Sequence, residues 1–88
     1  MRYNEEYNKR FGTVLDTPKS SKPVVRIEEA TIGPHGFNPN VMVLGGLPVD
    51  HPKKSLNGAL FFTSSSIVEV IDDEVETLNT VYKVLNWA

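Results

Sequence analysis

Apolar and polar residues alternate most clearly in the last third of the chain. Residues 65–71 and 74–85 are rich in Val, Ile and Thr, and they flank Asp72-Asp73. A tight turn at the two aspartates predicts a β-hairpin, since aspartate tolerates turn conformations. Because the apolar face changes along the second strand, we expect a bulge near residues 79–80. The predicted register places β-branched residues together and pairs Val70 with Val75, Glu69 with Glu76, Val68 with Thr77 and Ile67 with Leu78.

Three earlier segments also have the β-branched, apolar character of strands. Residues 24–32, 41–44 and 59–63 fit strands of the length found in small sheets. Alternation within the first of these segments breaks at Glu28-Glu29, which predicts a bulge or a half-exposed edge. Gly, Pro and Asn residues cluster between the segments and predict turns there.

The start of the chain has a helical period instead. Tyr3, Tyr7 and Phe11 recur at positions i, i+4 and i+8, so they share one face of a short helix. Asn4 stands where an N-cap is expected, and Gly12 stands where a C-terminal cap is expected. A two-turn helix is marginal alone, so its aromatic face must pack on something. That face either covers an open end of the sheet or binds a partner.

Together these segments predict one small domain over residues 1–88, with residues 16–23 as a loop or mobile linker. The expected fold is α+β and mainly β. A short N-terminal helix joins a curled antiparallel sheet, or partly open small barrel, of about five or six strands. The exposed edges of so small a sheet suggest that a homodimer could pair or cover them. The expected core contains Val25, Ile27, Val41, Val43, Leu60, Phe62, Val68, Val70, Val75, Tyr82 and Val84.

Composition narrows the classes of function. The chain of 88 residues has no cysteine, which excludes a disulfide, a thiolate metal cluster and a cysteine nucleophile. No apolar run approaches the roughly 18 residues of a membrane-spanning helix, and the first residues lack the apolar stretch of a secretory signal. We therefore expect a cytoplasmic protein with no membrane partner. The net charge of −2 argues against nucleic acid as a partner, because most domains that bind phosphate backbones are basic.

Acidic residues gather around the predicted hairpin turn, without a basic residue among them. They offer a surface for a basic partner. The alternative is a solvated turn whose charges protect an edge strand from aggregation. The candidate partner-binding residues are Glu69, Asp72, Asp73, Glu74 and Glu76.

A second hypothesis is a nucleic-acid or small-anion (nucleotide) binding protein. Residues 1–26 carry six basic and three acidic residues, with aromatic residues close by. The glycines of the turn between Gly33 and Gly36, next to Phe37, could form a backbone nest for an anion. Ordinary turn geometry explains the same glycines.

An enzyme is not expected. His35, Asp50 and His51 could form a metal site if the fold joined their loops, but their spacing matches no ligand pattern of a helix or hairpin. The serine run 64–66 lacks the sequence around a nucleophilic serine, and no phosphate-binding glycine motif is present. We therefore expect no catalytic residues, no metal and no cofactor.

The predicted hairpin also resembles a known group of proteins. Its strands TSSSIVEV (residues 63–70) and VETLNTVYKVL (residues 75–85), joined by an acidic turn, are similar to the C-terminal hairpin of small uncharacterised accessory proteins of tailed bacteriophages. This resemblance implies a phage accessory protein that acts in the host cytoplasm. It would bind and modulate, often inhibit, a host protein, without acting as an enzyme.

Overall fold

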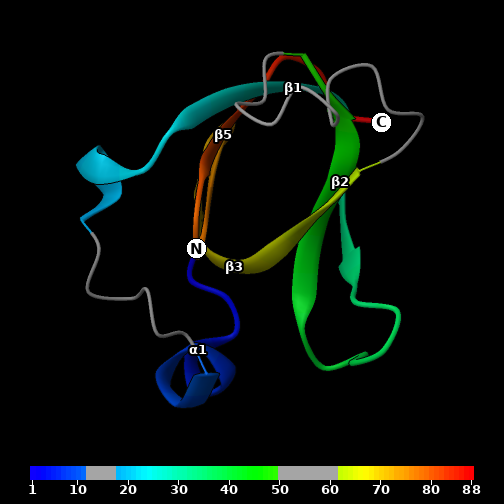
Figure 1. The fold of residues 1–88 in the computed structure, drawn as a ribbon. Helices are drawn as coiled ribbons and strands as arrows, with labels where there is room; N and C mark the ends of the chain where they lie inside the picture. Colours follow the sequence, from blue (N-terminus) through cyan, green and yellow to red (C-terminus); the bar gives the residue numbers. More distant parts are fainter. Residues whose placement is uncertain (12–17, 50–61) are drawn as a thin grey trace.

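The structure, a computed structural model, describes residues 1–11, 18–49 and 62–88. Most of these residues lie in strands, and Figure 1 shows the strands curving around a common centre. The elements in chain order are α1 (Glu5–Phe11), the 3-10 turn η1 (Lys19–Ser21), β1 (Val24–Pro34), β2 (Met42–Pro48), β3 (Phe62–Ile71), β4 (Glu74–Thr77) and β5 (Val81–Val84).

The five strands form a closed barrel in the order β1-β2-β3-β4-β5. Each strand is antiparallel to the one before it, whereas the closing pair of β1 and β5 is parallel. Strand direction alternates along the chain, so the first and fifth strands run the same way and can close the ring only in parallel. The predicted α+β fold with a small curled barrel is confirmed. Because the ring is closed over the described residues, the open edges that suggested a homodimer are absent there.

A bulge bends β1 at the predicted Glu28-Glu29 position. The pairing of β1 with β2 shifts register between Glu28 and Thr31, and Glu29 has a φ of 51°. We call the parallel pairing of β1 with β5 the parallel seam. Beyond the bulge, β1 continues this pairing with the C-terminal residues. The backbone N–H of Ala30 donates to the carbonyl of Asn86 (3.1 Å), and Ala30 bridges to Trp87 in parallel. The bulge therefore lets one strand serve both the barrel and the C-terminal segment.

The acidic turn between β3 and β4 forms at Asp72-Asp73, as predicted. Asp72 adopts a φ of 52°, which aspartate tolerates better than most residues. The predicted pairs of Val70 with Val75 and Glu69 with Glu76 are confirmed. The two remaining predicted pairs are wrong, because a register shift between Ile67 and Glu69 places Ile67 opposite Thr77.

The predicted strand 74–85 is two strands, β4 and β5, joined by a tight turn. The bulge expected near residues 79–80 is therefore a chain reversal. Thr77 closes it: its backbone N–H donates to the Thr80 carbonyl (2.8 Å) and its hydroxyl donates to the same carbonyl (3.0 Å). Asn79 lies in this turn, as is common in tight turns, and the buried Thr77 holds the turn by bonding to the backbone three residues ahead.

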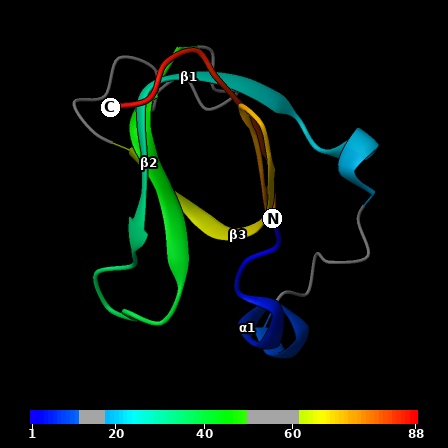
Figure 2. The same cartoon turned by 180° about the vertical axis from the view of Figure 1, so that it is seen from behind.

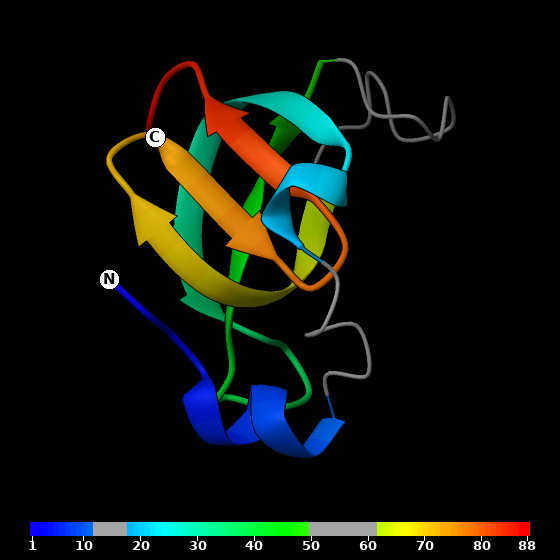
Figure 3. The ribbon, with the colours of Figure 1, turned by 90° about the vertical axis from the view of Figure 1, so that its left-hand side faces the viewer.

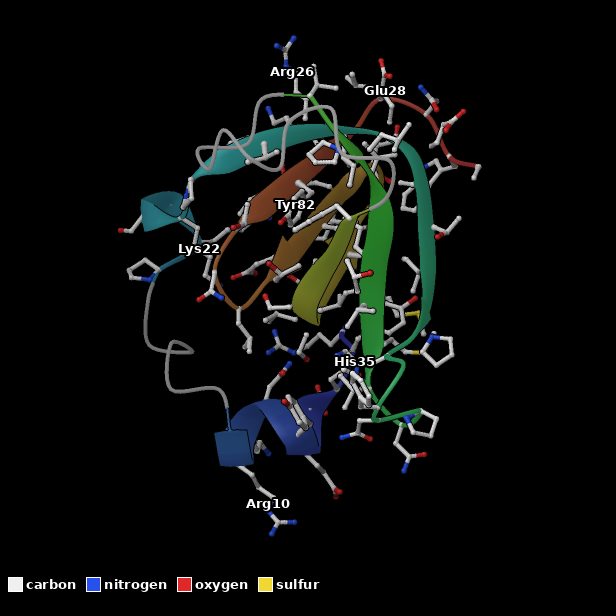
Figure 4. All side chains as sticks on the ribbon, turned by 45° about the vertical axis from the view of Figure 1, so that its right-hand side comes forward. Arg10, Lys22, Arg26, Glu28, His35 and Tyr82 are labelled. Carbon is white, nitrogen blue, oxygen red and sulfur yellow. The ribbon has the colours of Figure 1, made fainter. Side chains whose placement is uncertain are left out.

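The core fills the inside of the ring, as the side chains in Figure 4 show. Most of the predicted core residues are buried, while Phe62 and Val70 are half-buried and pack against the core. Leu60 lies outside the described residues. Among the described residues, four buried apolar residues are absent from the predicted core, which are Ala30, Leu44, Ile67 and Val81.

Helix α1 lies below the barrel, next to the turn between β1 and β2 (Figures 1 and 2). The prediction that the Asn4 side chain caps this helix is wrong. The Asn4 side chain does not cap the helix but bonds to two strands: Nδ2 donates to the carbonyls of Met42 (2.8 Å) and Ile67 (3.0 Å). Tyr3 packs against the core and Tyr7 is half-buried, so this face covers the barrel end. The Phe11 side chain and Gly12 lie outside the described part of the chain.

Candidate interaction groove at the hairpin tip

The structure places the five predicted partner-binding residues on one hairpin but in different surroundings. Asp72 and Asp73 are exposed in the turn, whereas Glu69, Glu74 and Glu76 lie on the strands and are half-buried. Only the two aspartates are therefore fully presented to solvent.

The three glutamates each meet a basic residue from elsewhere in the chain. Lys22 Nζ lies 2.6 Å from Glu76 Oε2, and the Lys22 side chain is only 2% exposed. The same ammonium donates to the carbonyl of Thr77 (2.8 Å). Arg2 lies 3.9 Å from Glu69, so the two opposed glutamates of the hairpin, Glu69 and Glu76, each have a compensating cation. Sequence analysis missed these pairs because the partners are far apart along the chain.

Lys19 pairs with Glu74 at the surface. This hydrogen bond lowers the pKa of the Glu74 carboxyl below its usual 4.5 and raises the pKa of the Lys19 ammonium above its usual 10.5. Both side chains stay charged at neutral pH. The segment around η1 is thus attached to β4 through two lysines, Lys19 and Lys22.

A groove of about 510 Å³ opens beside the turn between β3 and β4. We call it the hairpin groove. Its apolar surface comes from Ile71 and Leu85, which are 49% and 51% exposed. Trp87 is 42% exposed, and its Nε1 donates to Asp73 Oδ1 (2.8 Å). The residues that line the groove are Lys19, Ile71, Asp72, Asp73, Glu74, Lys83, Val84 and Leu85.

The hairpin groove joins apolar and charged surface in one place. Large half-exposed apolar side chains are costly to leave in water, and two of them, Ile71 and Leu85, line the groove. A third, Trp87, is hydrogen-bonded through its indole Nε1 to the lining residue Asp73. Neither Leu85 nor Trp87 was a candidate from the sequence, because nothing local places the last residues of the chain beside the acidic turn.

A second hollow, of about 550 Å³, lies between α1 and the turn from β1 to β2. Arg2 and Arg10 of the predicted basic segment line it on one side and Asn38 on the other, but Gly33 and Gly36, the glycines of the predicted anion nest, do not line it. Glu5 and Glu6 line the same hollow, and Arg2 pairs with Glu5 (3.3 Å). Its charge is therefore mixed.

Some of the residues considered for catalysis are described by the structure, and these make hydrogen bonds within the fold. The Ser64 hydroxyl donates to the Ser65 carbonyl (2.8 Å), and the Ser66 hydroxyl donates to Asn8 Oδ1 (2.7 Å). His35 Nδ1 accepts a hydrogen bond from the backbone N–H of Phe37 (3.0 Å). Among the described residues no group of three or more metal-binding side chains comes together, and Asp50 and His51 lie outside them.

Comparisons with known proteins give no family model, no curated protein and no solved structure that matches this chain. In the described part of the chain, no helix combines the length and the apolar character needed to cross a membrane.

Proposed function

We propose that this protein is a non-enzymatic binding module that docks on another protein through the hairpin groove. The observation that carries the proposal is that Ile71 and Leu85, each about half exposed, line one groove with Asp72 and Asp73, while the exposed Trp87 is hydrogen-bonded to Asp73. Elsewhere the barrel keeps most of its large apolar side chains inside. Apolar surface grouped at one tip is typical of an interaction site.

A partner bound in the hairpin groove would gain most of its binding free energy from a few apolar side chains. Burial of apolar surface contributes roughly 25 cal/mol per Å². Trp is enriched among the residues that dominate binding energy, and a side chain already held in place loses little entropy on binding. The bond from Trp87 to Asp73 supplies that preorganisation.

The groove also indicates the chemistry of the partner. Ile71 and Leu85 call for an apolar side chain, and the exposed Asp72 at the turn favours a Lys or Arg beside it. We propose a protein partner that presents such a pair. If the chain is a phage accessory protein, as the hairpin suggests, this partner is a host protein.

The alternative, a nucleotide or another small anion bound near α1, stays a prediction. The second hollow supports it through Arg2 and Arg10, and opposes it through Glu5 and Glu6. Because the acidic residues equal the basic ones there, the hairpin groove is the better supported site.

The test compares capture of proteins from a bacterial lysate by the tagged chain and by four variants. Leu85→Ser and Asp72→Asn change the groove. Val24→Ser and Glu28→Gln change exposed residues that do not line it, and Val24 is 54% exposed. We expect the groove variants to lose at least about tenfold in partner recovery, equivalent to about 1.4 kcal/mol, and the controls to match the original chain.

Thermal unfolding of each variant establishes that the fold persists. Recovery of the same partner by Leu85→Ser and by the unchanged chain would exclude the hairpin groove. An equal loss in Val24→Ser and Leu85→Ser would also exclude it, since binding would then follow general surface apolarity.

A further inference from the structure

The turn between β1 and β2 presents an aromatic side chain to solvent. Phe37 is 97% exposed, the highest value among the large apolar residues described. The turn around it is held by hydrogen bonds: His35 N–H donates to the Val41 carbonyl (2.8 Å), and Val41 N–H donates to the Asn38 carbonyl (3.0 Å). The Phe37 N–H donates to the His35 ring. The phenyl ring therefore projects from a preorganised support.

The segment that carries Phe37 has no formally charged residue of its own, and the charged residues of the N-terminal segment lie across the second hollow from Asn38. Residues 30–49 contain no Asp, Glu, Lys or Arg, although such residues make up 23% of the chain. A charged group is costly to remove from water, so a tip without one can be buried at low cost. Exposure, rigidity and absence of charge together make this turn suited to enter an apolar groove.

We propose that the Phe37 turn of one copy docks in the hairpin groove of a second copy of this chain. The groove of about 510 Å³ can admit a phenyl ring. Trp87, which donates a hydrogen bond to the groove residue Asp73, offers an aromatic contact next to it. The turn has no acidic residue that Asp72 or Asp73 would repel. This inference rests on the proposed function, because it uses the same groove and identifies one of its occupants.

The two surfaces lie at opposite ends of the molecule. Figure 3 shows the turn from β3 to β4 at the upper left and the turn from β1 to β2 at the bottom, beside α1. A single copy therefore cannot fill its own groove, and the contact between copies is head-to-tail. One ring with its neighbours buries less than the 1,200 Å² or so of a stable interface, so we expect a dissociation constant of roughly 0.1–1 mM.

Sedimentation velocity of the purified protein from about 10 µM to about 1 mM tests this, because the range spans the expected dissociation constant. The sedimentation coefficient of the unchanged chain should rise with concentration. Phe37→Ser and Leu85→Ser should each remain monomeric, since each lacks one half of the contact. Val24→Ser, the control, should associate like the unchanged chain. An equimolar mixture of Phe37→Ser and Leu85→Ser should form dimers and nothing larger, because only one intact contact can form between them.

Trp87 gives a second measurement, since it is the only tryptophan of the chain. Its emission should shift to shorter wavelength as the unchanged chain is concentrated, and should stay constant for Phe37→Ser. If Leu85→Ser unfolds, Ile71→Ser replaces it as the groove variant.

Several results would overturn self-docking: a monomer at every concentration, association of Phe37→Ser like the unchanged chain, or a mixture that stays monomeric. These results are distinct from failure of the proposed function. A monomeric chain whose groove variants still lose the lysate partner would reject self-docking alone. Self-association with unchanged capture by Leu85→Ser would reject the protein partner alone.

Discussion

Gly46 shows how closely β1 and β2 approach at one residue. Its φ of 156° belongs to a region that other residues rarely adopt. A Cβ atom there would lie 2.8 Å from the Glu28 backbone oxygen and 3.0 Å from Ile27 Cδ1. The bulged β1 and the glycine of β2 therefore depend on each other.

Gly46→Ala should destabilise the protein by about 1–3 kcal/mol, because both the backbone and the contact with Glu28 must shift. The melting temperature should fall by about 4–8 °C for each kcal/mol. Gly33→Ala is the control, since a Cβ at Gly33 meets no atom within 4 Å. It should change the free energy of unfolding by less than about 0.5 kcal/mol. Equal melting temperatures for the two variants would show that Gly46 is not constrained.

The role of a residue could be predicted where its contacts are close along the chain, and could not be predicted where its partner is far away in the sequence. The turn at Asp72 and the bulge at Glu28-Glu29 could be predicted from the residues at those positions. Asn4 was predicted as a helix cap from local position, whereas its amide bonds to Met42 and Ile67. No spacing rule relates such partners before the fold is known.

At the scale of elements, the segment of η1 and the residue after it is attached to the barrel by two ion pairs. Lys19 of η1 pairs with Glu74 and Lys22 pairs with Glu76, both on β4, and the two pairs differ in burial. The Lys22 pair is nearly inaccessible, whereas the Lys19 and Glu74 side chains are 38% and 34% exposed. A matched comparison of a buried and an exposed ion pair is therefore available within residues 19–22.

Lys22→Met should destabilise the protein by about 3–5 kcal/mol, because Glu76 keeps a buried charge without its cation. Lys19→Met should cost no more than about 1 kcal/mol, as is typical of exposed pairs. Urea unfolding measures both. The double variant Lys22→Met with Glu76→Leu should recover part of the loss. Equal midpoints of urea unfolding for Lys22→Met and Lys19→Met would show that burial does not make the Lys22–Glu76 pair more important for stability.

The hairpin was the element best predicted from the sequence, since its alternation and its turn residues agree. The acidic cluster was predicted as uncompensated, because no basic residue lies within it. In three dimensions η1 and the N-terminal residues supply the bases. The part of the candidate site that was missed, Leu85 and Trp87, depends on where the chain runs after β5.

At the scale of the whole molecule, the barrel encloses a titratable side chain. Tyr82 of β5 is buried in the ring near Phe62, with ring centroids 5.9 Å apart (Figure 4). Burial raises the pKa of its hydroxyl to about 12, since the phenolate is poorly solvated there. The folded state therefore holds this proton more tightly than the unfolded chain, where tyrosine has a pKa of about 10.

Stability should fall as the pH rises from about 10 towards about 12, because the unfolded state loses the Tyr82 proton first. Ultraviolet titration should show one tyrosine that ionises near pH 12 or only on unfolding. Tyr82→Phe should remove that step and flatten the loss of stability over the same range. Complete ionisation of all tyrosines near pH 10 in the folded protein would show that the ring interior is open to water.

The small curled sheet could be predicted from the pattern of apolar and polar residues, whereas the closure of the barrel could not. Short β-branched segments and frequent turns predicted a small curled sheet. The choice of a closed ring depends on β1 meeting β5, and no local feature of either strand indicates a parallel neighbour.

The parallel seam also has a consequence for how the chain matures during synthesis. β1 is translated before its partner β5, with β2, β3 and β4 between them. Each antiparallel pair from β2 onwards joins strands consecutive in the sequence, while the seam joins the two ends of the barrel and so requires the longest loop closure. The parallel pair can therefore form only after β5 has been translated, and until then the nascent chain holds an incomplete ring.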